Sequence, residues 1–127
     1  MTQEQKELLL KDLCTRLPYG VKCEVIKRRV DGEMLYIRNG SDALELTIDN
    51  VKEIVTNSMY EITPYLFPFS SMTEEQKEEW KSLMTKDTFG ILYYNSQSYD
   101  YLYKNHIDVR GLIPMGLAND ATRLKIY

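Results

Sequence analysis

The residues best suited to chemistry stand near the end of the chain, at His106, Asp108 and Arg110. In an extended chain these alternate side chains share one face, whereas on a helix only His106 and Arg110 would. A histidine beside a carboxylate and a guanidinium can serve in acid–base chemistry if a substrate pocket forms around it. The other interpretation is structural: Asp108 caps the following turn and pairs with Arg110. The sequence leaves both interpretations open.

The sequence contains none of the common catalytic or cofactor-binding motifs. It has no glycine-rich phosphate loop, no nucleophile elbow, no His-Glu-x-x-His and no Cys-x-x-Cys. One histidine and two cysteines, Cys14 and Cys23, are a poor set for a structural zinc site and too few for a disulfide scaffold. We therefore predict no catalytic, cofactor-binding or metal-binding residues, and we lean towards a protein that is not an enzyme.

The only basic run is Lys27-Arg28-Arg29. Three adjacent cations can contact phosphates, which would suggest a nucleic-acid partner. Asp31 and Glu33 follow at once, however, and the formal net charge of the chain is −3. The run is better explained as a solvated hairpin end, where charge discourages edge-to-edge pairing of strands. Nucleic-acid association is therefore our third hypothesis.

Length and composition indicate one globular domain, covering residues 1–127. The charged fraction of 28% and the apolar fraction of 43% are ordinary for a folded protein and argue against disorder. The sequence has no run of about 18 apolar residues, so we expect no membrane span. Residues 1–7 are polar and acidic rather than like a signal peptide, which favours the cytoplasm.

A capping-box pattern opens the chain, with Thr2 three residues before Gln5. It predicts a helix that runs to about Arg16, where Pro18 and Gly20 stop it. Its apolar residues recur at helical spacing and should face the core. They are Leu9, Leu10, Leu13, Cys14 and Leu17.

The next stretch alternates apolar and polar residues with a period of two, which is typical of strands. It predicts strands over residues 21–29, 33–38 and 44–48, and a fourth over 51–56. Asp31-Gly32 is a strong signal for the first hairpin turn. We therefore expect an α+β fold in which an antiparallel meander of three to four strands fills the first half, to about residue 63.

An apolar connector pinned by prolines, residues 64–72, joins the two halves. Pro64 and Pro68 fix their own φ and push the preceding residues towards extended conformations, so the connector cannot be helical. Its residues Phe67 and Phe69 are too apolar to be left in water. The connector either closes the core, which we favour, or forms the lip of a binding surface.

Residues 73–118 form the predicted helical half. A second capping box begins at Thr73, and Trp80 is expected to dock the helix that follows on the sheet. The sequence leaves open whether residues 86–95, which are apolar and β-prone, are strand or helix. We expect the C-terminal helices to pack on the sheet. Residues 119–127 then form a polar tail whose last apolar residues could add a short strand.

Two tags and the N-terminal stretch resemble a known group of proteins. The connector tag, residues 64–75, reads PYLFPFSSMTEE, and the second tag, residues 105–113, reads NHIDVRGLI. With residues 7–21 they resemble small uncharacterised proteins of gut Bacteroides-type bacteria and their phages. Val109 departs from the Tyr of that pattern. The resemblance implies a shared fold and a bacterial or phage origin, and it assigns no activity to any residue.

The leading hypothesis is a small non-enzymatic domain that acts through protein contacts, with another protein or with a second copy of itself. The alternative is a regulator or enzyme that binds a small molecule through the His106-Asp108-Arg110 region. We expect no cofactor. The large aromatic residues of the connector and the helical half are the candidate partner surface. They are Phe67, Phe69, Trp80, Tyr93 and Tyr94.

Overall fold

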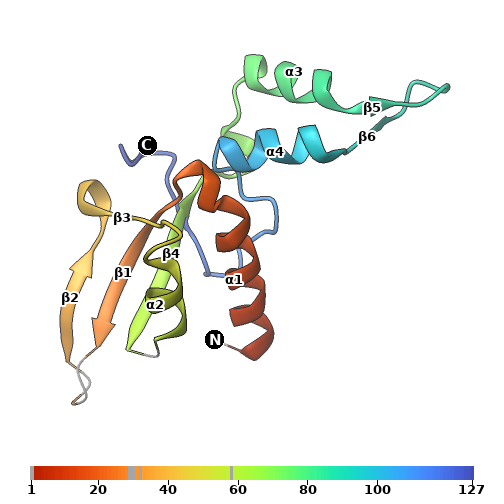
Figure 1. Ribbon diagram of the computed structural model, residues 1–127. Coiled ribbons are helices and arrows are strands. Elements are labelled where there is room, and N and C mark those ends of the chain that lie inside the picture. The colour runs from red at the N-terminus through yellow and green to blue at the C-terminus, as the bar shows by residue number, and fades with distance from the viewer. Residues whose placement is uncertain (1, 29–30, 32, 58) are drawn as a thin grey trace.

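Helix α1 (Gln3–Arg16) lies against one face of a mixed β-sheet in the computed structural model (Figure 1). The structure describes residues 2–28, 31, 33–57 and 59–127, with the backbone alone at residues 28, 34–37, 52, 55 and 56. The predicted helix and its capping box are confirmed. The Thr2 hydroxyl accepts the Gln5 N–H, and the Gln5 side chain accepts the Thr2 N–H, so two otherwise unpaired donors are satisfied.

The sheet has the order β2-β1-β4-β7. Strand β1 (Lys22–Arg28) pairs antiparallel with β2 (Met34–Arg38) on one side and with β4 (Tyr60–Leu66) on the other. The short β3 (Leu44–Glu45) pairs with the start of β1. On the far side β4 pairs with β7 (Asn119–Asp120), and this last pairing is parallel. The sheet is therefore mixed, whereas the sequence predicted an antiparallel meander.

Two of the predicted strands are wrong. The strand predicted over 44–48 is only the two residues of β3, and Ile48 is 82% exposed instead of facing the core. The strand predicted over 51–56 is helix α2 (Val51–Thr56). Its apolar residues recur three and four positions apart, which is the spacing of a helix face, and Ile54 packs against the main core. The predicted turn at Asp31-Gly32 lies partly outside the described residues.

The first part of the predicted connector is a strand. Residues 64–66 belong to β4, and Pro64 pairs with Cys23 of β1. Pro64 can sit inside a sheet because the β4–β7 pairing begins only at Tyr65, one residue later. The remainder forms η3 (Phe69–Ser71), a single 3₁₀ turn that leads to the next helix. The connector is therefore a central strand that continues into a turn.

The second half of the chain forms an arm that projects from the sheet (Figure 1). Helix α3 (Glu74–Leu83) packs against α4 (Ser96–Lys104), and between them the hairpin β5 (Thr85–Lys86) and β6 (Leu92–Tyr93) extends away from the rest. We call α3, the hairpin and α4 the arm. The prediction that both helices pack on the sheet is therefore wrong, because the two helices pack chiefly on each other.

The main core lies between α1 and the sheet. It contains Leu9 and Leu13 of α1, Val25 of β1 and Leu66 of β4, all of them buried. A smaller cluster on the opposite face joins Tyr65 to the tail residues Ala121 and Ile126. A third cluster, Met72, Leu102 and Ile107, joins the base of the arm to the connector. Apolar burial on this scale is the main favourable term for the fold.

The tail is part of the sheet. The Ala121 N–H donates to the Leu66 carbonyl over 2.8 Å, and the Tyr127 hydroxyl donates to the Tyr65 carbonyl over 2.8 Å. The same hydroxyl accepts the Lys22 N–H over 2.9 Å. The prediction of a polar tail is corrected accordingly: residues 119–127 supply β7 and cover one face of β4.

Truncation of a buried leucine of α1 should destabilise the protein more than truncation of an exposed leucine on the same helix. Leu13→Ala removes a side chain with no exposed surface, and we expect a loss of about 2–5 kcal/mol in the free energy of unfolding. Leu10→Ala makes the same chemical change on the same helix, where the side chain is 40% exposed, and should cost much less. Urea unfolding of both variants measures the difference. Equal losses would contradict the placement of the core.

Candidate functional site

Residues 106–110 lie beside the end of β4. The Phe67 N–H donates to the His106 carbonyl over 2.8 Å, and the Asp108 N–H donates to the Phe67 carbonyl over 2.8 Å. These bonds form a parallel bridge between Phe67 and Ile107 that continues the pairing just beyond β4. The segment predicted to carry chemistry is therefore positioned by backbone hydrogen bonds.

Asp108 has a structural role. Its two carboxylate oxygens accept the N–H groups of Leu112 and Ile113 over 2.8 and 2.9 Å. The side chain is buried, and the turn that it closes passes through Gly111, whose φ of +71° favours glycine. The predicted capping role of Asp108 is confirmed, and both of its oxygens are occupied by that role.

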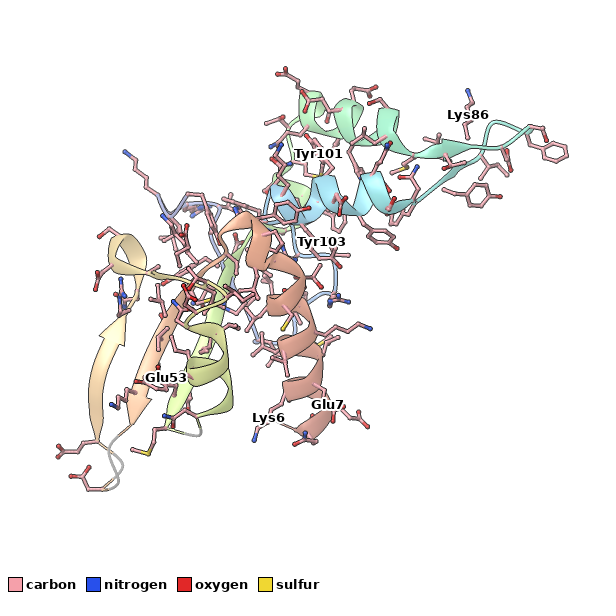
Figure 2. The ribbon with its side chains drawn as sticks, viewed as in Figure 1. Lys6, Glu7, Glu53, Lys86, Tyr101 and Tyr103 are labelled. Atoms are coloured by element: carbon pink, nitrogen blue, oxygen red, sulfur yellow. The ribbon has the colours of Figure 1, made fainter. Side chains whose placement is uncertain are left out.

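Arg110 contacts helix α1 instead of Asp108. Its Nε lies 3.3 Å from Asp12 Oδ1, while Arg16 Nε lies 2.8 Å from Asp12 Oδ2. Arg16 also donates through Nη2 to the Ile107 carbonyl over 2.6 Å. Tyr103, which extends from α4 towards α1 (Figure 2), has its ring centroid 4.9 Å from the Arg16 guanidinium and 5.9 Å from that of Arg110. We call Asp12, Arg16, Tyr103 and Arg110 the arginine cluster.

His106 lies apart from these pairs. Its φ is +59°, in the left-handed region that few residues other than glycine adopt. The imidazole stacks on the Tyr127 ring, with centroids 3.7 Å and planes 12° apart. Burial, and after it the charges of Arg16 and Lys22, lowers the pKa of His106 to about 4, so the ring is neutral at pH 7. Its Nδ1 is buried and has no hydrogen-bond partner in the described part of the chain.

A surface pocket of about 310 Å³ lies beside His106. Its walls come from the connector, from the start of α3 and the end of α4 at the base of the arm, and from the tail, and include Phe67, Gln76, Lys104 and Tyr127. A second pocket of about 470 Å³ shares Ser71 and Thr122 with the first and continues along the tail to Arg123 and Leu124. We call the first of these the His106 pocket.

Of the three residues predicted to act together, only His106 lines this pocket. Asp108 and Arg110 are held in structural contacts on other sides of the segment. Within the described residues, no three His, Cys, Asp or Glu side chains are grouped so that they could hold a metal ion. The geometry therefore does not assemble the acid–base constellation that the spacing allowed.

The predicted aromatic surface divides into two parts. Phe69, Trp80, Tyr94 and Tyr99 form a continuous row, with successive ring centroids 5.6, 5.3 and 5.3 Å apart. Phe69 and Trp80 are half-buried at the base of the arm, so the prediction that Trp80 anchors its helix on the sheet is wrong. Phe67 packs on the same third cluster as Phe69 and Trp80, but its ring contact is with Tyr127, at 5.9 Å between centroids, and not with the row. Tyr94 and Tyr99, the outer two rings of the row, are 49% and 39% exposed.

Several exposed apolar residues lie together on the hairpin, and most of them were not predicted as a surface. Phe89 is 88% exposed at the tip. The Asp87 carboxylate accepts the N–H groups of Phe89 and Ile91, each over 2.9 Å, and the Tyr93 hydroxyl over 3.1 Å. These bonds lower the pKa of Asp87. The turn signal that could have placed Phe89 at a tip is the Asp-x-x-Gly spacing of Asp87 and Gly90, where Gly90 has a φ of +82°.

The remaining predicted features carry little chemistry in the structure. Lys27 Nζ lies 5.5 Å from the Tyr60 ring centroid, while the Arg28 side chain and Arg29 lie outside the described residues. Cys14 and Cys23 are free thiols, and burial raises the pKa of Cys23. Cys14 is exposed, so the prediction that it faces the core is wrong. Among the described helices, none combines the length and apolar character that a membrane span requires.

Acidification should weaken the fold through His106. Because its pKa falls from 6.5 to about 4 on folding, the unfolded chain binds a proton in this pH range that the folded chain does not. The contribution of neutral His106 to the free energy of unfolding is complete above pH 6.5. As the pH falls towards 4, that free energy should fall by roughly 1–3 kcal/mol. Urea unfolding at a series of pH values measures it.

The matched variant is His106→Asn, which removes the titrating group and keeps a residue type that tolerates positive φ. It should have a flatter stability profile between pH 6.5 and 4. Identical profiles for the variant and the natural sequence would show that His106 does not cause the pH dependence.

Removing the single anion of the arginine cluster should be costly. Asp12→Asn leaves Arg16, which has no exposed surface, without a counter-charge, and we expect a loss of about 3–5 kcal/mol in the free energy of unfolding. Glu7→Gln makes the same change on an exposed position of α1 that points away from the sheet (Figure 2) and should alter stability by less than about 0.5 kcal/mol. Thermal or urea unfolding compares them, and similar effects would contradict the cluster's structural role.

Comparison with known proteins identifies no relative. No protein-family model matches the chain, and no curated protein and no solved structure matches it. The geometry described above is therefore the basis for a functional conclusion.

Proposed function

We propose that this protein is a small non-enzymatic interaction domain of bacterial or phage origin, and that the outer part of its arm is the contact surface. The partner is another protein chain, bound in the cytoplasm, where the two free thiols would stay reduced. The observation that carries the proposal is the exposure of Phe89, 88% in a side chain of that size, at the tip of an ordered hairpin.

Phe89 is one of a group rather than a single exposed residue. Tyr93, Tyr94 and Tyr99 follow it on the same arm and are 50%, 49% and 39% exposed. Ile91 and Leu92 lie between the tip and these tyrosines and are also exposed. Scattered exposed apolar residues are normal, but several on one projecting element mark a contact site. Tyrosine and phenylalanine are also the residue types enriched at such sites.

Hydrogen bonds within the hairpin support the turn that displays Phe89. Asp87 accepts two backbone N–H groups and one hydroxyl, which fixes the turn that displays Phe89. The base of the arm is equally constrained, because the Tyr101 hydroxyl donates to Glu79 of α3 over 2.9 Å. Burial and this hydrogen bond raise the pKa of Tyr101 to about 12. A preorganised surface has less ordering entropy to lose on binding.

A photo-crosslinking experiment tests the proposal. The residue p-benzoylphenylalanine replaces Phe89 in one variant and Ile48 in another, since Ile48 is 82% exposed on a different part of the molecule. Irradiation of the purified protein detects self-association, and irradiation in a lysate of a Bacteroides-type host detects a different partner. We expect a discrete product of defined mass from position 89 and none from position 48.

The Phe89→Ser variant separates binding from stability. Because Phe89 contacts so little of the fold, this change should alter stability by less than about 0.5 kcal/mol while it abolishes the complex. Phe67→Ser, at a residue packed into the third cluster, should instead lower the unfolding temperature. A protein that stays monomeric by light scattering and gives no product from position 89 would exclude the proposal.

A further inference from the structure

The His106 pocket lies away from the projecting hairpin and contains polar groups that the fold does not use. At about 310 Å³ it has room for a small molecule. Gln76 accepts the Thr73 N–H through Oε1, which leaves both Nε2 hydrogens without a described partner. Lys104, at the end of α4, makes no ion pair within the described residues. A lysine and an amide donor therefore stand unpaired on the walls of one pocket.

The charge of this pocket is positive. Lys104 is the only charged side chain on its walls, because His106 is neutral at pH 7. Lys22 lies just outside, with Nζ 5.9 Å from the Tyr127 ring centroid. After burial, the charges of Arg16 and Lys22 also lower the pKa of His106, although Asp12 partly offsets the charge of Arg16. The His106 pocket therefore favours an anion.

The apolar part of the pocket is aromatic. Phe67 and Tyr127 line it, with their ring centroids 5.9 Å apart and their planes inclined by 51°. Tyr127 remains 44% exposed although its hydroxyl is fully engaged with β1 and β4. The hydroxyl is therefore not offered to a ligand, and the ring is the part of Tyr127 that a ligand would contact.

We propose that the His106 pocket binds a small monocarboxylate with a compact apolar body. Lys104 Nζ and Gln76 Nε2 hold the carboxylate, and the apolar body rests against Phe67 and Tyr127. One lysine and one amide suit a single negative charge. A phosphate dianion generally receives arginine forks or several backbone N–H groups. The pocket walls include no arginine, and Gln76, their one residue from the first turn of α3, already donates its backbone N–H to the Thr73 hydroxyl.

Benzoate is the probe, because it combines one carboxylate with a small apolar ring. Benzamide has the same shape without the charge, and phenyl phosphate carries a dianion on the same ring. The chain has one histidine, so its imidazole C–H signals in a two-dimensional NMR spectrum report on His106 without ambiguity. Titration of each probe against the full chain follows these signals together with the backbone amides of Lys104 and Thr122.

We expect benzoate to shift these signals saturably and to bind at least about ten-fold more tightly than benzamide, as a charged hydrogen bond implies. Bound benzoate should also raise the pKa of His106, since a nearby negative charge favours the imidazolium form. Lys104→Gln should weaken benzoate binding about ten-fold and leave benzamide unchanged. Lys6→Gln, which makes the same charge change at the far end of α1 (Figure 2), should change neither.

Four results would overturn the proposal. They are the absence of saturable shifts with benzoate, equal binding of benzamide, a Lys104→Gln variant that binds benzoate normally, and phenyl phosphate binding far more tightly than benzoate. None of these results tests the proposed protein contact of the hairpin, because Phe89 lies at the tip of the arm and Lys104 at its base. A Phe89→Ser variant should accordingly bind benzoate as the natural sequence does.

Discussion

The position of Arg16 determines how the parts of this molecule fit together. Its guanidinium has no exposed surface, so the helix that carries it must supply a counter-charge within reach, and Asp12 does so one turn earlier. The same guanidinium donates to the Ile107 carbonyl, a contact across 91 residues of sequence. A buried ion pair of this kind contributes little net stability compared with apolar packing. The hydrogen bonds of Arg16 to Asp12 and to the Ile107 carbonyl are directional, however, so they restrict where residues 106–110 can lie.

Other constraints follow from this one. Once Ile107 is fixed, the backbone on either side of it pairs with Phe67, and Asp108 closes the turn that brings the chain back to the sheet. The returning chain then forms β7 and ends with Tyr127 between His106 and β1. The left-handed conformation of His106 is held by these contacts on both sides. The contacts of His106, Asp108 and Arg110 are thus largely with other parts of the fold.

Local signals in the sequence predicted part of the local structure. The capping boxes at Thr2 and Thr73 marked two helix starts correctly, because both partners of such a box lie within four residues of each other. Residues 51–56 were mistaken for a strand, although the three-residue spacing of Val51 and Ile54 fits only a helix. The parallel β4–β7 pairing could not be predicted, since it joins residues more than fifty positions apart. For the same reason the sequence could suggest that His106, Asp108 and Arg110 act together but could not show that Arg110 faces Asp12.

The place of Trp80 has a practical consequence for spectroscopy. It is the only tryptophan, and it lies between Phe69 and Tyr94 at the base of the arm rather than in the core beneath α1. Intrinsic fluorescence therefore reports on the arm, whereas far-ultraviolet circular dichroism is dominated by helices in both parts. Parts of one protein can open with different free energies. In this molecule the two optical signals distinguish detachment of the arm from cooperative melting of the whole chain, with no added label.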